Sequence, residues 1–242
     1  MQANLVVIAA GRPDNSLDNR LVNGSKNRIN IRGRSLLLRS VDALERDFEG
    51  INLILFETDE NLLEIRKELK PILNKLNIIN LKHQTKGALC SALMAIDNLD
   101  KSQEVIIASG DAIIVGGLDK HVMELRNQGV EGGTIAFESD LPRWSYVRID
   151  SNNNVIELTE KEVVSTIATT GVFYFKSSAE FIKAATWTMI NSPGIRGTYF
   201  TSEALNYLIF TGQRVGYALC DKHDYIPMAN ESDLRTLENL LP

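Results

Sequence analysis

The sequence has few cysteines, and no hydrophobic run is long enough to cross a membrane. Its two cysteines, Cys90 and Cys220, belong to no C-x-x-C pair, which excludes a disulfide framework and a cysteine-based zinc or redox motif. The longest apolar runs, such as Leu5 to Ala10, are far shorter than the ~20 residues of a membrane-spanning helix. The first residues also lack the basic segment and cleavage site of a signal peptide. We therefore expect a cytoplasmic protein without a membrane partner.

Positive charge is not in excess either. The 26 Lys and Arg residues are outnumbered by 31 Asp and Glu, and the formal net charge is −5. Proteins that bind nucleic acid usually present a basic surface, so we do not expect nucleic acid as a partner. Hydrophobic residues make up 44% of the chain and charged residues 24%, which is typical of a soluble domain and excludes disorder and fibre. Without a linker, a low-complexity tract or an internal repeat, residues 1–242 are expected to form a single domain.

Strand and helix patterns alternate along the first half of the chain. The apolar, β-branched run from Leu5 to Ala10 predicts a strand buried on both faces, and Ser35 can cap the helix that follows. Further strands are predicted at 51–56, 78–81 and 104–108, with helices at 61–76 and 87–99. This alternation predicts right-handed crossovers and a mostly parallel, Rossmann-like sheet with helices on both faces.

Beyond residue 130 the pattern changes to short strands. They are predicted at 133–137, 146–149, 155–158 and 171–175, with the polar turn 151–154 between two of them. Helices are expected at 179–190 and 201–211, followed by a strand at 214–218 and a last helix from Glu231. We therefore expect a mixed sheet within one α/β domain.

Two places at the carboxyl ends of predicted strands can bind a ligand, because loops and helix N-termini there present free backbone N–H groups. The first is Gly11 with the polar loop from Arg12 to Gly33, whose length points to a function. The second is Ser109-Gly110-Asp111. A carboxylate at this position can hold Mg²⁺ together with phosphate oxygens and water, or it can merely cap a turn. Spacing alone leaves both interpretations of Asp111 open.

The loop is rich in basic residues. Six of the 26 Lys and Arg residues fall within 23 positions: Arg12, Arg20, Lys26, Arg28, Arg32 and Arg34. They follow the first strand, where a triphosphate would lie if one is bound; the alternative is a solvated basic loop. No G-x-x-x-x-G-K-[ST] motif is present, which excludes a P-loop enzyme. The three histidines have no i, i+4 pairing and predict no metal cluster.

Several short motifs follow one another in a particular order. In the first half they are Ala9-Ala10-Gly11, Ser25-Lys26, Thr85-Lys86-Gly87-Ala88 and Ser109-Gly110-Asp111. In the second half they are Trp144 to Val147, Val155 to Thr159, Glu160-Lys161, Thr170 to Phe175 and Gly197 to Asn206. This ordered set covers nearly the whole chain. It resembles the sugar-phosphate nucleotidyltransferases, also called nucleoside-diphosphate-sugar pyrophosphorylases.

The resemblance implies a nucleotidyltransferase fold of the GT-A-like type, with a nucleotide-binding half at residues 1–130 and a sugar or acceptor half at 131–242. It implies transfer of a nucleoside monophosphate from a nucleoside triphosphate to a sugar 1-phosphate or similar phosphorylated metabolite, with release of pyrophosphate. Mg²⁺ is the implied cofactor, and nucleotide-sugar and polysaccharide biosynthesis the implied context. A homodimer is the default oligomer.

The resemblance also implies roles by position. The nucleotide would be bound by Ala9, Ala10, Gly11, Gln84, Gly87 and Gly110. Lys26 would be catalytic and neutralise charge on the reacting phosphates, with Arg12 or Arg20 in place of the family's signature arginine. Asp111 and Asp224 would bind the metal, and Glu160, Lys161, Gly171 and Tyr146 would bind the substrate.

Three departures from the family pattern stand beside these matches. The G-x-G-T-R signature is replaced by Arg12 to Ser16, the usual Pro-Lys is Ser25-Lys26, and Pro227 stands where a second metal-binding Asp is expected. Asp224 or Asp221 could fill that role after a small register shift. These departures favour an alternative, an inactive homologue that binds a nucleotide or sugar nucleotide as a regulatory subunit. A glycosyltransferase is less expected, because Asp111 is followed by Ala112-Ile113 and forms no Asp-x-Asp pair.

Overall fold

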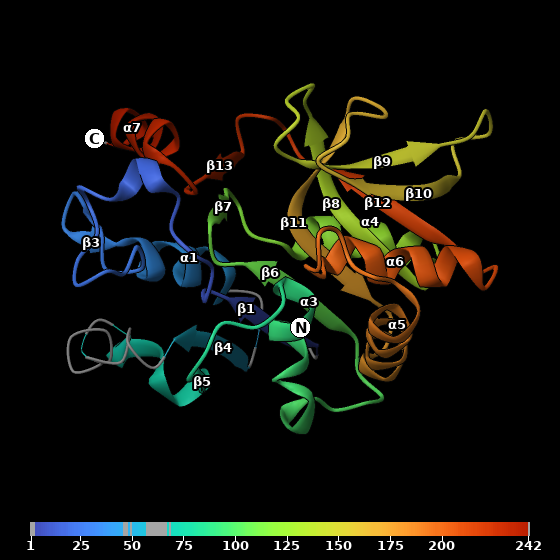
Figure 1. Cartoon of the computed structure of the whole chain (residues 1–242), viewed down its shortest axis with the longest axis horizontal. Coiled ribbons are helices and arrows are strands. Elements are labelled where there is room, and N and C mark those ends of the chain that lie inside the picture. Colours follow the sequence, from blue (N-terminus) through green and yellow to red (C-terminus); the bar gives the residue numbers. More distant parts are fainter. Residues whose placement is uncertain (1–2, 46–47, 49, 57–66, 68, 242) are drawn as a thin grey trace.

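A nine-stranded sheet runs through the molecule, and both halves of the chain contribute to it. The computed structural model describes residues 3–45, 48, 50–56, 67 and 69–241 (Figure 1). The strands of the first half are β1 (Asn4–Ile8), β4 (Ile51–Phe56), β5 (Leu76–Leu81) and β6 (Val105–Ser109). Those of the second half are β8 (Gly132–Glu138), β9 (Ser145–Ile149), β10 (Val155–Glu160), β11 (Ile167–Phe175) and β12 (Val215–Leu219).

The pairing of these strands divides the sheet into a parallel and a mixed part. β1 lies between β4 and β6, and β4 pairs with β5, all in parallel. β11 pairs antiparallel with β6, β8 and β9, while β12 adds to β8 in parallel and β10 adds to β9 antiparallel. Because β11 attaches the later strands to β6, the two halves share one sheet. The predicted mixed sheet is confirmed.

Helices cover both faces of the sheet, as predicted. In β1, Leu5 and Val7 belong to one hydrophobic cluster and Val6 belongs to another. Each of these three residues is 0% exposed. The first cluster is covered by α1 (Leu36–Glu45) and α4 (Asp119–Asn127). The second is covered by α3 (Ala88–Leu93), α5 (Ser178–Asn191) and α6 (Thr201–Phe210). Burial on both faces of the sheet explains why β1 is continuously apolar from Leu5 to Ile8.

The two ends of the chain meet in a third, smaller core. The loop after β1 contains the short 3₁₀ helix η1 (Asn15–Leu17) and the strands β2 (Asn30–Ile31) and β3 (Arg34–Ser35). Its Leu17, Ile29 and Ile31 pack with Leu234 and Leu237 of the C-terminal helix α7 (Glu231–Leu240). Figure 1 shows α7 in red beside this blue loop. The basic loop is therefore folded against α7 rather than solvated along its length.

A small antiparallel pair brings the C-terminal segment to the end of β6. β7 (Ala112–Ile114) follows Asp111 directly and pairs with β13 (Tyr225–Pro227). Neither three-residue strand was predicted from the sequence, and nor was α4. The backbone N–H of Met228 donates to the carbonyl of Asp111 at 2.6 Å, so the register of this pair is fixed next to the predicted site.

Two predicted helices differ from the structure. Seven of the sixteen residues of the helix predicted at 61–76 lie outside the described residues. Its last part is the 3₁₀ helix η3 (Lys70–Lys75), and Leu76 already belongs to β5. The helix predicted at 87–99 is divided into α3 and the 3₁₀ helix η4 (Ile96–Asn98). Within the described part of the chain, no helix has both the length and the hydrophobicity needed to span a bilayer.

Candidate functional site

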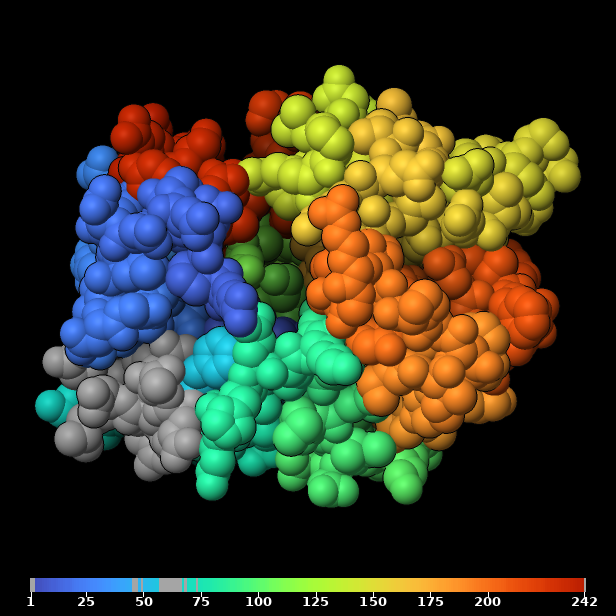
Figure 2. All heavy atoms as spheres, in the orientation of Figure 1, coloured from blue at the N-terminus to red at the C-terminus, as the bar shows by residue number. Residues whose placement is uncertain are grey.

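A cavity of about 260 Å³ lies at the carboxyl ends of β1 and β6. Open α/β sheets bind their ligands at this position. One wall comes from the first half of the chain and includes Ala10, Gly11, Gln84 and Gly87. The opposite wall comes from the second half and includes Ser145, Glu160, Thr169, Gly171 and Phe200. Figure 2 shows the surface hollowed where the blue N-terminal loop, the teal segment near residue 85 and the orange segment near residue 200 approach one another.

Lys26 and Asp111 form an ion pair beside this cavity, which Asp111 lines. Lys26 Nζ lies 2.6 Å from Asp111 Oδ1, and the lysine side chain is only 5% exposed. Asn27 fixes the adjacent backbone, because its buried amide donates to the carbonyl of Ala9 at 2.7 Å. A Cβ on Gly11 would lie 3.2 Å from Lys26 Nζ and 3.5 Å from Asp111 Oδ2. Since a buried charge requires a partner, Asp111 holds the lysine ammonium at the end of β1.

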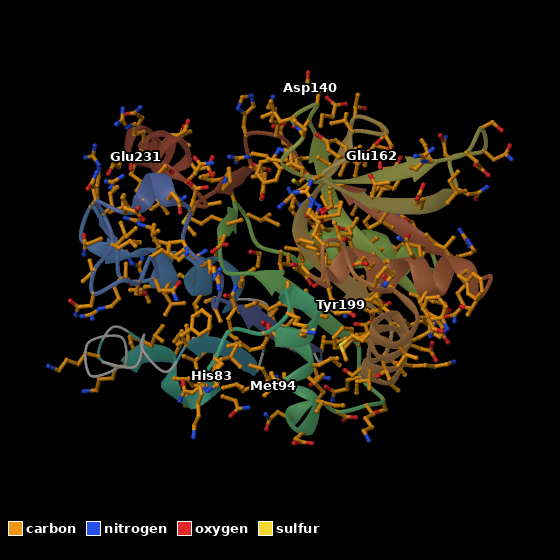
Figure 3. All side chains as sticks on the ribbon, viewed as in Figure 1. His83, Met94, Asp140, Glu162, Tyr199 and Glu231 are labelled. Carbon is orange, nitrogen blue, oxygen red and sulfur yellow. The ribbon has the colours of Figure 1, made fainter. Side chains whose placement is uncertain are left out.

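Gly87 allows the segment before α6 to approach α3 closely. Its φ is +120°, and a Cβ there would lie 2.3 Å from the carbonyl oxygen of Tyr199. The N–H of Tyr199 donates to the carbonyl of Lys86 at 2.7 Å, and the N–H of Leu89 donates to the carbonyl of Tyr199 at 3.2 Å. Figure 3 shows Tyr199 next to α3. This contact joins the two walls of the cavity at their outer end.

Glu160 is a half-buried carboxyl group in the wall of the second half. It ends β10 and accepts a hydrogen bond from the hydroxyl of Ser145. Burial raises the pKa of Glu160 above its ordinary value of 4.5, although the Ser145 hydrogen bond and the charge of Lys161 oppose this shift. A carboxyl group of this kind can accept hydrogen bonds from ligand hydroxyl groups, and when protonated it can donate one.

Lys161 lies at the rim of the cavity. The residue is exposed and has a left-handed backbone with φ of 57°. Its N–H donates to the carbonyl of Trp144 at 3.0 Å, and its Nζ lies 5.6 Å from the centre of the Phe200 ring. The side chain is therefore near the wall of the second half without lining the cavity.

A second cavity, of about 170 Å³, adjoins the first. Ser109, Asp111, Ser145, Thr169 and Gly171 line both cavities. The remaining walls of the second cavity include Arg143, Trp144, Tyr225 and Pro227. Asp111 thus lies where the two cavities meet, with the carboxyl end of β6 on one side and β13 on the other.

Of the residues that the resemblance implies, most lie at the first cavity. Ala10, Gly11, Gln84, Gly87, Asp111, Glu160 and Gly171 line it. Lys26 contacts Asp111 from below. Ala9 and Gly110 lie directly behind the wall, where a Cβ on Gly110 would lie 2.9 Å from the Cβ of Ala9. The structure therefore brings together predicted residues that are up to 162 positions apart, from Ala9 to Gly171.

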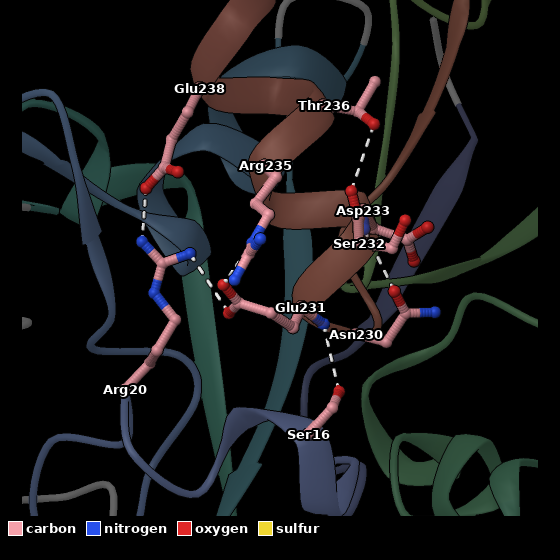
Figure 4. A network of polar contacts seen from close by, with 9 residues as sticks. All are labelled: Ser16, Arg20, Asn230, Glu231, Ser232, Asp233, Arg235, Thr236 and Glu238. Carbon is pink, nitrogen blue, oxygen red and sulfur yellow. Dashed lines mark hydrogen bonds and ion pairs between the residues drawn. The ribbon is translucent and has the colours of Figure 1, made fainter.

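Arg20 and Arg12 line neither cavity. Arg20 Nη1 lies 3.4 Å from Glu231 Oε2, and Arg20 also pairs with Glu238, both of α7 (Figure 4). These partners raise the pKa of Arg20, chiefly through the Glu238 hydrogen bond. Arg12 is exposed. The charge of Arg20 is therefore used to anchor the C-terminal helix.

Tyr146 also lies outside both cavities. It is 0% exposed, and its hydroxyl donates to the carbonyl of Leu141 at 2.7 Å. Side chains alternate between the two faces of a strand, so Tyr146 points into the core while its neighbour Ser145 points toward the cavity. This alternation could have identified Ser145 from the sequence.

Asp224 is not beside Asp111. Its carboxylate lies 3.5 Å from Lys120 Nζ, and its carbonyl accepts from the N–H of Val115 at 2.8 Å. Val115 is four residues beyond Asp111, which corresponds to roughly 13 Å of extended chain. Pro227, in contrast, pairs with Ala112 next to Asp111.

Among the described residues, the junction of the two cavities therefore offers a metal ion one carboxylate, that of Asp111. No cluster of three His, Cys, Asp or Glu side chains suited to a metal is found among them. One oxygen of Asp111 is already in contact with Lys26, and Pro227 brings no oxygen ligand from its side chain. Mg²⁺ prefers several oxygen ligands, so these side chains do not form a complete metal site by themselves.

Several residues at the two cavities were not identified as site residues from the sequence. Arg143, Thr169 and Tyr225 were not named at all, while Ser109, Trp144, Ser145 and the segment 200–202 lie within the quoted motifs but were given no role of their own. Thr201 and Ser202 begin α6, so their position depends on the packing of this helix. For Arg143, Thr169 and Tyr225, sequence spacing alone carried no signal.

Comparison with known proteins agrees with this arrangement. The model of the family named Nucleotidyl transferase matches residues 24–223. A nucleoside-diphosphate-sugar pyrophosphorylase from Vibrio cholerae RC9 has a similar structure, with a TM-score of 0.82 at 18% identity, over 97% of this chain and 99% of that one. A structure described as a glucose-1-phosphate thymidylyltransferase from Bacillus anthracis, in complex with a sucrose, gives 0.79 at 16% identity, over 98% and 94%. A search of curated proteins found no match. On the family match, the chain belongs to the nucleotidyl transferase family.

Proposed function

We propose that the protein transfers a nucleoside monophosphate from a nucleoside triphosphate to a sugar 1-phosphate and releases pyrophosphate. The observation that carries this proposal is a cavity with walls from both halves of the chain, which is lined by Asp111, the ion-pair partner of Lys26. Walls from the two halves can contact two different substrates. The family match supports the class of reaction.

The nucleotide would lie against the wall of the first half. The backbone at Ala10 and Gly11 ends β1 and faces the cavity, with Ala9 and Gly110 packed behind it. Gln84 and Gly87 lie on the outer part of the same wall. We assign this wall to the base and ribose, because it combines backbone groups with little side-chain bulk.

The acceptor would lie against the wall of the second half. Glu160 and Ser145 form a hydrogen-bonded pair that can bind sugar hydroxyl groups, and Gly171 leaves space beside Ser109. Lys161 is at the rim, where its ammonium group can reach the acceptor phosphate. This arrangement directs the phosphate of the acceptor toward Lys26 and Asp111.

The reaction itself requires little covalent chemistry from the protein. An ionised oxygen of the acceptor phosphate forms a bond to the α-phosphorus, and the bond from that phosphorus to the bridging oxygen breaks. The electron pair leaves with pyrophosphate, and no general base is needed. Catalysis in such a step comes from positioning and from cations near the phosphate oxygens. Lys26 would supply the fixed cation.

We treat Mg²⁺ as part of the triphosphate substrate. The metal would enter with the nucleotide, because Asp111 is the one carboxylate that the described residues bring to the junction of the cavities. Asp111 would then contact the substrate complex while it continues to hold Lys26. The resident side chains supply position and charge in this scheme.

Pyrophosphate release from each common nucleoside triphosphate, with a panel of sugar 1-phosphates, tests the proposal. The variant Lys26→Met should lower kcat by at least about a hundredfold, as expected when a group that stabilises transition-state charge is removed. Lys176→Met is a matched control, because Lys176 makes an equally short ion pair with Glu131 at 2.6 Å but is 55% exposed. Turnover unchanged in Lys26→Met would contradict the assigned role.

One alternative has a structural observation in its favour. Arg20 forms an ion pair with Glu231 of α7, and Pro227 lies next to Asp111. The cavity therefore has fewer charged side chains than the resemblance implies. An inactive homologue would bind a nucleotide without releasing pyrophosphate. Thermal stabilisation by a nucleoside triphosphate, with no pyrophosphate from any acceptor, would favour this alternative.

A further inference from the structure

Thr169 carries a hydroxyl group that has no hydrogen bond within the described part of the protein. The residue is 3% exposed and lines both cavities. Its Oγ1 atom does not belong to the unpaired described atoms that are closed off from solvent, so the accessible surface of this oxygen faces the cavities. Most buried polar groups are hydrogen-bonded. A ligand in the cavities can therefore accept a hydrogen bond from Thr169.

Strand β11 directs the Thr169 side chain toward the cavities. Ala168 is 0% exposed and belongs to the first hydrophobic cluster, and successive side chains of a strand point to opposite faces. After Thr169 the register with β8 shifts, and Gly171 in this bulge has a φ of +81°. Bulges often lie beside active sites and re-aim side chains. The orientation of Thr169 is therefore set by the sheet rather than by a loop.

Thr169 belongs to a row of polar side chains on neighbouring strands. Glu160 of β10 lies opposite Ser145 of β9. Thr169 of β11 lies opposite Ser145 in turn, because the residues before Thr169 and after Ser145 pair with each other in antiparallel register. Such opposed residues have Cβ atoms about 4.5 to 5.5 Å apart. Ser109 of β6 follows on the other side of β11, so the row runs from Glu160 to the end of β6.

The other hydroxyl groups of this row already make a hydrogen bond within the protein. Ser145 donates to Glu160, and Ser109 Oγ accepts from the N–H of Asp111 at 3.3 Å. The next step rests on the proposed function, which places the sugar at Glu160 and directs the acceptor phosphate toward Asp111. Thr169 lies between these two carboxyl groups in the order of the strands. Its hydroxyl therefore lies where the sugar is joined to its phosphate.

We propose that Thr169 is an acceptor-binding residue that donates a hydrogen bond to a non-attacking oxygen of the acceptor phosphate. An ionised phosphate oxygen has no proton to donate, so the hydroxyl must be the donor. Hydrogen bonds to charged groups are roughly twice as strong as those between neutral groups. Holding one oxygen in this way orients the phosphate and leaves a second oxygen to attack the α-phosphorus. Thr169 thus binds and orients the acceptor without taking a proton in the reaction.

Thr170 provides a matched control on the same strand. It is 2% exposed and also borders the second cavity, but its hydroxyl donates to the carbonyl of Ile135 at 3.0 Å. Valine at either position removes the hydroxyl and keeps the branched shape. Thr170→Val should lower the urea midpoint, because a protein hydrogen bond is lost. Thr169→Val should leave the midpoint equal or higher; an equal loss in both variants would mean that Thr169 has a partner in the protein and would overturn the inference.

Calorimetric titration of the full-length protein with the 1-phosphates of α-D-glucose, α-D-galactose, α-D-mannose and N-acetyl-α-D-glucosamine tests the contact itself. Thr169→Val should weaken the tightest of these complexes at least about tenfold, the change expected for one hydrogen bond to a charged group. Thr169→Ser keeps the hydroxyl and should retain most of the affinity, as should Thr170→Val. The affinity for nucleoside triphosphates should stay the same in all three variants, because Thr169 belongs to the acceptor wall.

Three binding results would overturn the inference. None of the four sugar 1-phosphates binds the parent protein, or Thr169→Val binds the tightest one as well as the parent does, or Thr169→Val loses equal affinity for the matching free sugar. Pyrophosphate release is measured separately. Turnover in Thr169→Val with an unchanged KM for the acceptor would reject this inference and leave the proposed function intact. The expected loss of acceptor binding, without pyrophosphate from any triphosphate, would support this inference and reject the proposed function.

Discussion

Lys26 and Asp111 are 85 positions apart in the sequence, yet their side chains meet at 2.6 Å at the junction of two cavities. The contact joins the loop after β1 to the end of β6. Gly11 faces the pair, because a Cβ there would lie 3.2 Å from Lys26 Nζ and 3.5 Å from Asp111 Oδ2. The pair thus connects two segments of the fold, and we propose that it also acts in the reaction. Experiments can separate these two roles.

Removing the carboxylate should destabilise the fold. Asp111→Asn leaves the Lys26 ammonium buried without an anionic partner. Removal of one partner of a fully buried pair costs about 3 to 5 kcal/mol. We expect about 1 to 3 kcal/mol here, because the Asp111 side chain is 29% exposed and solvent reduces the effect. Urea denaturation measures the loss, and the double variant Lys26→Met/Asp111→Asn should recover part of it. A single variant as stable as the parent would show that the pair is not needed.

Glu160 should make stability depend on pH. Its pKa is raised by burial in the folded protein, so the folded state binds more protons than the unfolded state just above the ordinary value. The free energy of unfolding therefore falls as pH rises from about 4.5 through the raised pKa. Below about 4.5 both states bind the proton, so the protein does not yet lose this stability. Glu160→Gln should flatten this part of the profile. Urea titrations of both proteins between pH 4 and about 7 measure the difference, and parallel profiles would contradict it.

Gly87 tests the contact that joins the two walls. In Gly87→Ala, the new Cβ would lie 2.3 Å from the carbonyl oxygen of Tyr199, so the segment before α6 must move. Gly116→Ala is the matched control, because Gly116 also has a positive φ, of +84°, but no atom lies within 4 Å of its Cβ position. The control should lose about 1 kcal/mol from backbone strain alone. Gly87→Ala should lose clearly more and also weaken nucleotide binding; equal losses would reject a role for the close approach.

Arg20 should act on the C-terminal helix rather than on turnover. Its partners Glu231 and Glu238 lie on α7, and Ser16 Oγ accepts from the N–H of Glu231 at 3.1 Å (Figure 4). Arg20→Met should therefore speed amide hydrogen exchange in residues 231–240 and keep most of the pyrophosphate release. Lys183→Met is the control, since Lys183 pairs with Glu180 on a different helix. A loss of turnover with unchanged amide hydrogen exchange would instead support the catalytic role that the resemblance implies for Arg20.

The architecture could be predicted from the sequence because the central strands are apolar on both faces. Leu5, Val6 and Val7 are all fully buried, and this pattern needs helices on both sides of a sheet. The positions of Gly11 and Asp111 at the same edge also followed, since parallel strands end at one edge, while the place of Lys26 was implied by the family resemblance. The direct contact of Lys26 with Asp111 did not follow, because it depends on the path of the loop between Gly11 and Lys26.

The predicted site residues that lie away from the two cavities depend on partners that are distant in the sequence. Arg20 is 211 and 218 positions from the carboxylates that hold it, and no local pattern identifies such pairs. β7 and β13 are three residues long and pair across more than a hundred positions, so Asp224 was placed near Asp111 without knowledge of the register. The cytoplasmic location and the homodimer stay predictions from the sequence.

Pro227 provides the last test, which concerns the metal. Pro227 and Asp111 line the second cavity together, and Pro227 pairs with Ala112. Pro227→Asp would place a second carboxylate beside the first, and two carboxylates are a common basis for a divalent-cation site. Calorimetry with Mn²⁺ in the absence of nucleotide should show binding at least about tenfold tighter than in the parent protein, a gain of roughly 1.4 kcal/mol. The double variant Asp111→Asn/Pro227→Asp should lose this gain, because one carboxylate is then missing again. Equal Mn²⁺ affinity in the parent and Pro227→Asp proteins would mean that another residue already supplies the second ligand, and the view that the metal enters with the triphosphate would have to be abandoned.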